Sequence, residues 1–190
     1  MLKSSLRVIG ITGRKYAGKD TVANYLCGEH GFVKLSFAAP LKETCKQLFG
    51  LTDDQVNGNS KEVIDKRWNV SPRRIMQFVG TELYRNHMGE LFPGMGRDFW
   101  IEHMKYTIGE LQKTNSHVKV VISDVRFQNE IDFIHDSFNG EIWRVHRETE
   151  DVVEHESENN SVLLDVDIEI ENDGDGLKHL HENIELKFRK

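Results

Sequence analysis

The hydrophobic positions of this chain fall into short apolar runs separated by segments with helical spacing. Residues 7–12 form a short β-branched run, and residues 7–12, 32–37 and 118–124 are each predicted to be strands. The run 118–124 is apolar at consecutive positions, which is typical of a strand buried on both faces. Residues 141–147 predict a fourth strand, and alternation over residues 166–172 predicts a fifth.

Helices are predicted between these strands, and their start and stop signals are visible. Pro40 lies in the first turn of one helix, while Ser71 caps another that has Pro72 at its first position. The polar, turn-rich residues 50–72 are expected at the surface. The predicted helices cover residues 20–29, about 40–49, 72–87, 99–112, 127–138 and 176–188.

Strands that alternate with helices predict an α/β fold, with a mostly parallel, doubly wound sheet and right-handed crossovers. The helix-rich stretch between the second and third strands predicts a lobe beside the sheet. We therefore expect residues 1–190 to form a single domain.

Composition narrows the class of protein. A chain of 190 residues with 38% hydrophobic and 29% charged residues is expected to be a soluble globular domain. A net charge of -6 argues against a general nucleic-acid binder, and no apolar run has the length of a membrane span. Cys27 and Cys45 have neither disulfide nor zinc spacing, and the first residues lack a secretory signal, so reduced thiols in a cytoplasmic compartment are expected.

A phosphate-binding loop is predicted between the first strand and the first helix. The stretch from Gly13 to Lys19 has the glycine and lysine spacing of such a loop. Glycines let successive backbone N–H groups point inward, the helix start adds its positive dipole end, and the lysine ammonium reaches the outer phosphates. A chance glycine-rich turn would not explain why strand, spacing, lysine and helix agree.

The residue after Lys19 departs from the usual loop. Asp20 replaces the hydroxyl residue that normally contacts magnesium, and Thr21 comes one position later. Mg²⁺ prefers oxygen ligands and keeps several waters, so Asp20 can hold it directly or through water. Thr21 is expected to place its hydroxyl on the phosphates and to share the metal site.

Further motifs give the chain a family resemblance that covers nearly its whole length. Together with the loop, the motifs resemble the phage-type deoxynucleoside monophosphate kinases of the P-loop nucleotide kinase superfamily. The resemblance implies a three-layer sandwich with a five-stranded parallel sheet, a helical monophosphate-binding lobe at about 39–113, a short lid at about 147–162, and phosphoryl transfer from ATP. The motifs are "FAAPLKE" (37–43), "RWNVSPRRIMQFVGTEL" (67–83), "ISDVRFQNE" (122–130), "HESENN" (155–160) and the late "IENDG" (170–174).

The lobe is expected to bind the acceptor nucleotide. Arg74, Gln77 and Thr81 lie at i, i+3 and i+7, hence on one helix face. An arginine for the phosphate, an amide for a base edge and the indole of Trp68 for stacking would make a nucleotide pocket. The alternatives are an amphipathic helix with a solvated basic end and, for Trp100, a place in the core. The acceptor residues that the resemblance implies in the lobe are Leu41, Lys42, Trp68, Arg73, Arg74, Gln77, Gly80, Thr81 and Trp100.

The remaining site residues follow the strands. Asp124 ends the third strand, where a parallel sheet presents ligand-binding groups, although an Asp there could also cap the next helix. By resemblance, Lys15, Lys19 and Arg126 are catalytic, and Lys15, Asp124, Arg126 and Glu130 face the acceptor. Arg147 is the cation of the lid, and the turn at Asn172–Gly174 holds adenine or is an ordinary turn. The expected cofactor-binding residues are Gly13, Ala17, Gly18, Lys19, Asp20, Thr21, Arg147, Asn172 and Gly174.

These expectations combine into one reaction. The γ-phosphoryl group of ATP, with Mg²⁺, passes to a deoxynucleoside monophosphate, and the cations neutralise charge as two anions approach. Small-molecule nucleotides are the expected partners, with no nucleic-acid polymer and no membrane, and a homodimer is left open. The expected location is the cytoplasm of a bacterial cell or of a phage- or virus-infected host. Rival readings are a phosphomevalonate kinase, a dephospho-coenzyme A kinase and a non-catalytic nucleotide-binding module.

Overall fold

The computed structural model describes residues 6–147, 164–172 and 176–188. The chain divides into two compact units. One, the sheet unit, comprises Met1–Ser36 and Thr107–Lys190, and the other, the helical unit, comprises Phe37–Tyr106. The lobe expected at about 39–113 corresponds in sequence to the helical unit and the first residues that follow it.

A five-stranded, fully parallel sheet forms the centre of the sheet unit. The strand order is β2-β3-β1-β4-β5, and every neighbouring pair is parallel. The α/β fold with a five-stranded parallel sheet is therefore confirmed. The strands are β1 (Arg7–Thr12), β2 (Phe32–Leu35), β3 (Lys119–Ile122), β4 (Glu141–His146) and β5 (Ile168–Glu171).

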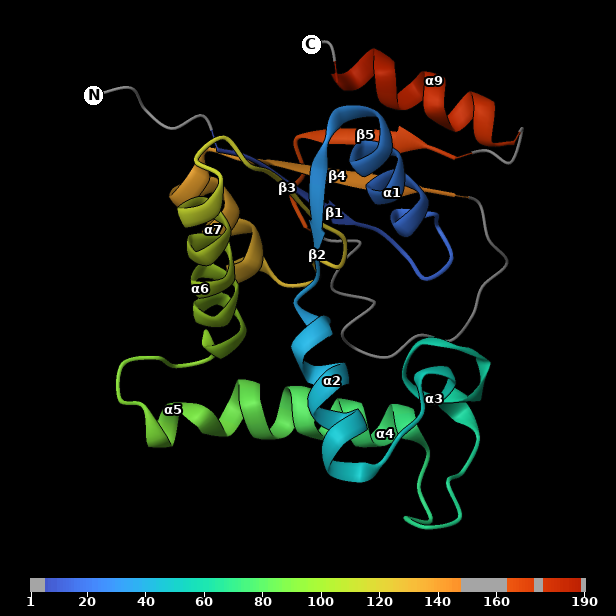
Figure 1. Cartoon of the computed structure of the whole chain (residues 1–190), viewed down its shortest axis with the longest axis vertical. Helices are drawn as coiled ribbons and strands as arrows, with labels where there is room; N and C mark the ends of the chain where they lie inside the picture. Colours follow the sequence, from blue (N-terminus) through green and yellow to red (C-terminus); the bar gives the residue numbers. More distant parts are fainter. Residues whose placement is uncertain (1–5, 148–163, 173–175, 189–190) are drawn as a thin grey trace. The chain divides into compact units, whose positions relative to one another are not determined.

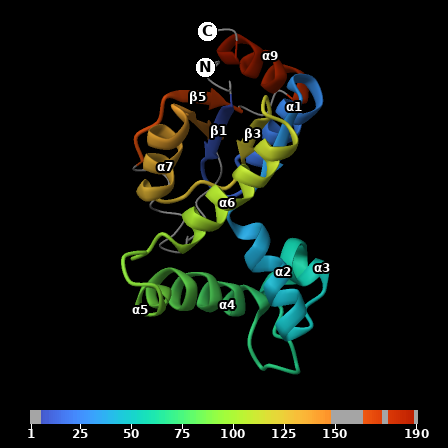
Figure 2. The same ribbon diagram turned by 60° about the vertical axis from the view of Figure 1, so that its left-hand side comes forward.

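Helices cover both faces of this sheet. Helices α1 (Lys19–His30) and α9 (Leu177–Phe188) lie on one face and α7 (Gln128–Phe138) on the other (Figures 1 and 2). Ile9 and Ile11 pack among the buried residues of α1 and α9. Between them Gly10 faces α7, where a Cβ atom would lie 2.7 Å from Ile134 Cδ1. Alternate residues of β1 therefore serve opposite layers, as the two-residue period of a strand requires.

The helical unit has a small apolar core of its own. Its buried residues are Cys45, Leu51, Val56, Ile75 and Val79. Helix α6 begins here and continues beyond Tyr106 into the sheet unit. The elements are α2 (Ala38–Phe49), α3 (Asp53–Asn57), the 3₁₀ turn η1 (Asn59–Glu62), α4 (Pro72–Gln77), η2 (Phe78–His87), α5 (Met88–Leu91) and α6 (Phe99–Thr114).

The helix expected at 72–87 begins as predicted but changes type. Ser71 caps it by accepting a hydrogen bond from the Arg74 N–H (3.3 Å), with Pro72 at the first position. From Phe78 to His87 the backbone is a π-helix instead of an α-helix. The Gly80 carbonyl oxygen accepts a hydrogen bond from the Trp100 indole within this wider stretch, a tertiary contact that helical periodicity cannot reveal.

None of the helices in the described parts of the chain is both long and apolar enough to cross a lipid bilayer.

Candidate active site

The carboxyl edge of the sheet gathers most of the predicted residues of the sheet unit. Because all five strands are parallel, the segments that follow them lie at the same edge. The loop at 13–18 follows β1, Asp124 and Arg126 follow β3, Arg147 follows β4 and Asn172 follows β5. Four separate stretches of sequence thus contribute to one edge.

The phosphate loop has a backbone that only glycine suits at two positions. Gly13 has φ 139°, and a Cβ atom there would lie 2.4 Å from the Val145 carbonyl oxygen. Gly18 has φ 103° and is the N-cap of α1, so no side chain occupies the cap of that helix. A helix start without a side-chain cap favours an anion.

The two lysines of the loop have different partners, the loop backbone for Lys19 and the Tyr16 ring for Lys15. The Lys19 ammonium donates hydrogen bonds to the carbonyl oxygens of Gly13 (2.7 Å) and Arg14 (2.6 Å). The Lys15 ammonium lies 4.8 Å from the centre of the Tyr16 ring, and Tyr16 itself has φ 65°. The Lys19 side chain is therefore folded over the loop that is predicted to hold phosphate.

Asp20 has a partner that the sequence analysis did not identify. Its side chain is 80% exposed, and Oδ1 accepts a hydrogen bond from the Lys34 ammonium at 2.6 Å. Lys34 also donates to Asn24 Oδ1 (3.1 Å). An exposed carboxylate beside a phosphate loop suits Mg²⁺ chemically, but here one of its oxygens already carries a cation. Thr21 follows, half-buried, in the first helical turn.

Glu130, and not Asp124, serves the start of helix α7 (Gln128–Phe138). Helix α7 begins at Gln128 with Phe127 as N-cap, so the alternative that Asp124 caps it is wrong. Glu130, which is 1% exposed, serves the helix start instead, because its Oε2 accepts from the N–H groups of Arg126 (2.8 Å) and Phe127 (3.2 Å). The buried carboxylate thereby fixes the backbone at Arg126.

Asp124 is held from the neighbouring strand. Its Oδ2 accepts a hydrogen bond from the Ser36 hydroxyl at 2.7 Å. Ser36 directly follows β2, which pairs with β3, and both residues are half-buried. The apolar pattern places Ser36 inside the strand expected at 32–37, and a serine at a strand end is the polar signal in the sequence for this contact.

Asn172 reaches the phosphate loop with its side chain. Its Nδ2 donates to the Ala17 carbonyl oxygen (2.8 Å), and its backbone N–H donates to the His146 carbonyl oxygen (2.8 Å). A Cβ atom on Gly18 would lie 2.6 Å from the same Nδ2. Arg147, at the start of the expected lid, is exposed after β4. The rest of the lid lies within 148–163 and Gly174 lies within 173–175, and both ranges are outside the described residues.

Three residues of the helical unit that were predicted to bind the acceptor, Leu41, Gly80 and Trp100, lie together and pack on one another. A Cβ atom on Gly80 would lie 2.5 Å from Leu41 Cδ2. The Trp100 Nε1–H donates to the Gly80 carbonyl oxygen (2.9 Å), and its ring contacts Phe99. Trp100 is 8% exposed, so its indole is part of the core, the alternative that the sequence left open, and its place in the nucleotide pocket stays a prediction.

The two predicted arginines are exposed enough to bind a ligand but have acidic partners. Arg73 forms an ion pair with Glu62 of η1, and Arg74 pairs with Glu82 at 2.8 Å. Neither glutamate is among the expected site residues, although Glu82 lies two helical turns from Arg74. Lys42, Gln77 and Thr81 are half-buried on α2, α4 and η2.

Trp68, the predicted stacking residue, is 46% exposed in the loop before α4. Its Nε1–H donates to the Phe49 carbonyl oxygen at 2.9 Å. The indole is therefore fixed at one edge while much of its surface remains accessible to a ligand.

Comparisons with known proteins agree with these observations. The family model described as deoxynucleotide monophosphate kinase matches residues 48–184. A protein of Acanthamoeba polyphaga mimivirus named "Putative deoxynucleotide monophosphate kinase" is 45% identical over 130 residues, which are 67% of this chain and 67% of that protein.

Solved structures resemble the fold at low identity. The crystal structure of TT1252 from Thermus thermophilus has a TM-score of 0.53 and 16% identity, covering 97% of this chain and 96% of that one. The dephospho-CoA kinase from Campylobacter jejuni has a TM-score of 0.47 and 13% identity, with 97% of each chain covered. The likeness to TT1252, at 16% identity, shows a shared fold and does not select a substrate.

Proposed function

The chain belongs to the deoxynucleotide monophosphate kinase family and phosphorylates deoxynucleoside monophosphates, and we propose that the group it transfers is the γ-phosphoryl of ATP bound with Mg²⁺ at the phosphate loop. The bond from the γ-phosphorus to its bridging oxygen breaks, and a new bond forms to an oxygen of the acceptor phosphate. The products are ADP and the deoxynucleoside diphosphate. The acceptor phosphate is already an anion, so the reaction needs positioning and charge neutralisation in place of a strong base.

The geometry of the phosphate loop carries the ATP assignment. The positive φ of Gly13 and Gly18 curls the loop, and α1 begins with a cap that has no side chain. Lys19 lies over this loop on two carbonyl oxygens, from which its ammonium can transfer to a phosphate oxygen. Loop amides, helix dipole and ammonium together supply the positive field for the donor. Ala17 lies inside this loop and takes part through its backbone.

Asp20 and Thr21 would hold the Mg²⁺. The donor set fits, because a carboxylate and a hydroxyl are hard oxygen ligands and the metal keeps waters in its remaining positions. Since Lys34 binds Asp20 Oδ1, the metal would displace that ammonium or use the other oxygen or a bridging water. When bound, Mg²⁺ neutralises charge on the phosphates.

Lys15 and Arg126 would share the neutralisation of the transferred group with Lys19. The Glu130 carboxylate fixes the backbone of Arg126, so we assign Glu130 a positioning part in place of the substrate contact first expected. Asp124, held by Ser36, is proposed to orient the acceptor. Arg147 is proposed to act on the phosphates from the lid, and Asn172 to support the loop and the adenine, together with the backbone at Gly174.

The acceptor would be held by the helical unit. We assign its phosphate to Arg74 with help from Lys42 and Arg73, a base edge to Gln77, and stacking on the base to Trp68. An incoming phosphate would replace Glu82 on Arg74, which is an exchange of one exposed anion for another. Thr81 adds a hydroxyl, while Leu41 and Gly80 shape the wall by packing on each other.

The setting of this reaction is also a proposal. We place the enzyme in the cytoplasm of a bacterial or virus-infected cell, which the viral relative supports. Its partners would be small nucleotides, and no nucleic-acid polymer is expected from a net charge of -6. Homodimerisation stays a prediction that a sedimentation measurement decides.

A substrate screen tests the proposal. ADP release with ATP and Mg²⁺ would be followed for the four deoxynucleoside monophosphates, their ribose forms, phosphomevalonate and dephospho-coenzyme A. We expect turnover with at least one deoxynucleotide. Lys19→Ala should lose it by about a hundredfold or more while the circular dichroism spectrum stays unchanged, since the lysine serves phosphates from a loop. Turnover of Lys19→Ala within tenfold of the parent would contradict the donor site, and phosphomevalonate as the only good acceptor would contradict the reaction.

A further inference from the structure

The loop that carries Trp68 is tightly closed on itself. Asp65 and Val70 form an isolated antiparallel bridge, in which the Asp65 N–H donates to the Val70 carbonyl oxygen at 3.0 Å. The Asn69 N–H donates to the Asp65 carbonyl oxygen at 2.8 Å, and Asn69 has φ 54°. Trp68 therefore lies within a six-residue loop whose two ends are joined by hydrogen bonds.

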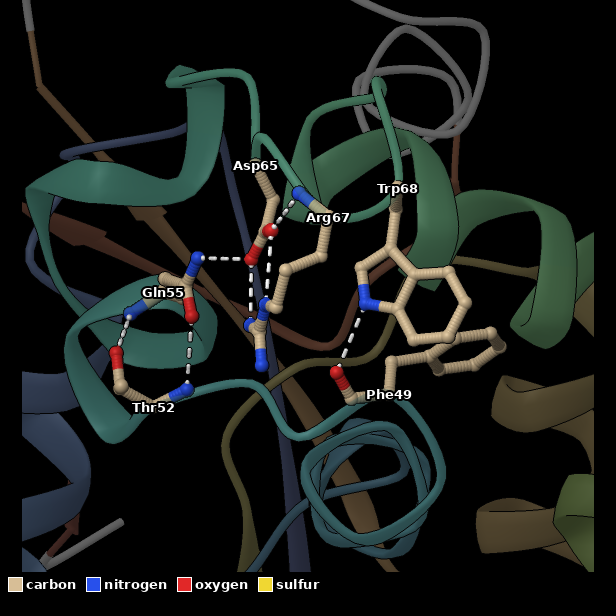
Figure 3. Close-up of polar contacts among 6 residues, drawn as sticks. All are labelled: Phe49, Thr52, Gln55, Asp65, Arg67 and Trp68. Carbon is tan, nitrogen blue, oxygen red and sulfur yellow. Dashed lines mark hydrogen bonds and ion pairs between the residues drawn. The ribbon is translucent and has the colours of Figure 1, made fainter.

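The Asp65 carboxylate holds this loop from inside (Figure 3). Oδ1 accepts from the backbone N–H of Arg67 (2.9 Å) and from its Nε (3.0 Å). Oδ2 accepts from Arg67 Nη2 (2.6 Å) and from Gln55 Nε2 (2.8 Å). The guanidinium and the Gln55 amide hold the pKa of Asp65 well below its usual range, so the carboxylate is charged at neutral pH. We call Asp65, Arg67 and Gln55 the carboxylate clamp.

The carboxylate clamp is anchored to neighbouring helices on both sides. Gln55 belongs to the capping box of α3, in which its Oε1 accepts from the Thr52 N–H (2.9 Å) and its own N–H donates to Thr52 Oγ1 (3.3 Å) (Figure 3). The Arg67 guanidinium lies on Gly50 at the end of α2, where a Cβ atom would be 2.9 Å from Nη1. The loop cannot shift without breaking one of these attachments.

Trp68 is held against the same helix end. Phe49 is the last residue of α2, so its carbonyl oxygen has no partner in the helix, and the indole N–H supplies one at 2.9 Å. The indole also meets the Phe49 ring edge to face, with ring centres 5.5 Å apart at 85°. Because the side chain stays 46% exposed, it presents a large aromatic surface in a fixed orientation (Figure 3).

We propose that Asp65 is a positioning residue for the acceptor: through Arg67 and the closed loop it holds Trp68 in the orientation in which the indole stacks on the nucleobase of the deoxynucleoside monophosphate. The inference rests on the proposed function, in which Trp68 contacts the base. A preorganised indole loses less conformational entropy when the base binds than a mobile one does. Asp65→Asn would keep the shape of the side chain. Its N–H₂ group would face one of the donors whose hydrogen bonds the carboxylate now accepts.

A double-mutant cycle tests the inference. Asp65→Asn, Trp68→Ala and the double variant would be compared for KM of the best deoxynucleotide, kcat and KM of ATP. Asp54→Asn is the matched control, because Asp54 makes the same kind of carboxylate bond to a backbone N–H, that of Asn59 (3.2 Å), in the same unit without touching the loop 65–70. Arg67→Lys keeps the charge and removes the fork, which gives a second variant if Asp65→Asn folds poorly.

The expected pattern separates positioning from simple stability. Trp68→Ala and Asp65→Asn should each raise the KM of the acceptor about tenfold, with kcat and the KM of ATP within twofold of the parent. In the Trp68→Ala background Asp65→Asn should add nothing, Arg67→Lys should give a smaller rise in the parent background, and Asp54→Asn should match the parent.

Other patterns overturn the inference. Multiplicative effects of the two substitutions, or an unchanged KM in Asp65→Asn and Arg67→Lys, would show that the clamp does not act through Trp68. An unchanged KM in Trp68→Ala would show that the indole does not contact the acceptor. If the parent phosphorylates no deoxynucleotide, it is the proposed function that fails, and acrylamide quenching of the exposed Trp68 still reports whether Asp65→Asn frees the indole.

Discussion

Asp20 and Lys34 show how one residue outside the phosphate loop can influence its chemistry. The two side chains meet at 2.6 Å although they lie on different elements, α1 and β2. The Asp20 side chain is 80% exposed and that of Lys34 32%, so water screens the ion pair and it contributes little stability, in the range of about 0–1 kcal/mol. Under the proposed function its consequence is competition, because Mg²⁺ and the Lys34 ammonium would bind the same carboxylate.

This competition gives a prediction at the residue scale. Asp20→Ala should raise the Mg²⁺ concentration needed for half-maximal activity several-fold, with partial rescue at higher Mg²⁺. Lys34→Ala should lower that concentration by about two- to fivefold, the ratio that a surface ion pair of up to about 1 kcal/mol can produce. Titration of the rate with Mg²⁺ at saturating ATP measures both.

Lys46→Ala serves as the control for these Mg²⁺ titrations. Lys46 takes part in ion pairs of the same surface kind, with Glu43 at 3.1 Å and Asp53 at 3.5 Å, but in the helical unit. Its curve should coincide with that of the parent. If Asp20→Ala also leaves the curve unchanged, Asp20 serves only the start of α1, as an acidic residue beside a helix dipole.

At the scale of elements, the segment formed by α4 and η2 carries the acceptor side of the proposal. Arg74 and Gln77 lie one turn apart on α4, and the π-helix that follows contains Gly80 and Thr81. Helices of this wide type often coincide with functional sites. Within η2 the Gly80 carbonyl oxygen accepts a hydrogen bond from the Trp100 indole, which ties η2 to α6.

The face shared by Arg74 and Gln77 gives the second prediction. Loss of a charge-assisted contact costs about 1.5–3 kcal/mol, or roughly ten- to a hundredfold. Arg74→Ala should therefore raise the KM of every deoxynucleotide by a similar factor, since all carry the same phosphate. Gln77→Ala should instead change the ranking among bases, because an amide reads a base edge. Steady-state kinetics with all four acceptors measure both effects, and the KM of ATP should not move.

Arg97→Ala is a suitable control for the lost charge, since Arg97 is exposed in the loop before α6. It should leave all acceptor KM values within twofold of the parent. A comparable rise for Arg97→Ala and Arg74→Ala would reduce the role of Arg74 to general attraction of anions. A uniform rise for Gln77→Ala would mean that the amide binds sugar or phosphate and not the base.

At the scale of the whole molecule, each compact unit contains one cysteine. Cys27 is partly buried on α1 in the sheet unit, and Cys45 is fully buried in the core of the helical unit. Burial raises the pKa of the Cys45 thiol to about 11 and also raises that of Cys27. The thiolate is the reactive form, so both groups react more slowly than a free thiol, Cys45 most of all because it is fully buried.

Thiol labelling can therefore report the opening of each unit separately. In Cys27→Ser at pH 8, Cys45 should react with iodoacetamide only when the helical unit opens. A deoxynucleotide at a hundred times its dissociation constant should slow this reaction by about a hundredfold, because the ligand stabilises the closed form by about 2.7 kcal/mol. ATP alone should have a smaller effect on Cys45, since the proposal places ATP in the other unit.

Cys45→Ser leaves only Cys27 to react and therefore reports on the sheet unit. Mass spectrometry after timed quenching measures both rates. Labelling of Cys45 at the rate of a free thiol would show that the helical unit is not closed, and equal protection by ATP and deoxynucleotide would contradict the division of ligands between the units.

Much of the fold followed from local signals in the chain. All five strands and the main helices lie where hydrophobic period and capping residues predicted them, and Ser71, Pro72 and Gly31 mark helix ends. The phosphate loop was equally visible, because strand, glycines, lysine and helix are consecutive. Such features depend on residues within a few positions of one another, so the backbone geometry of a short segment is enough to determine them.

The polar partners of the site were decided only by tertiary structure. Ser36 and Asp124 are 88 positions apart, and Asn172 and Ala17 are 155 apart, yet each pair is hydrogen-bonded because parallel pairing brings the ends of β2, β3 and β5 to one edge. Trp100 is a core residue, and its buried indole N–H donates to the Gly80 carbonyl oxygen on another helix. A residue type and its spacing state what a side chain can bond, whereas the sheet order and the packing of helices determine which partner it meets.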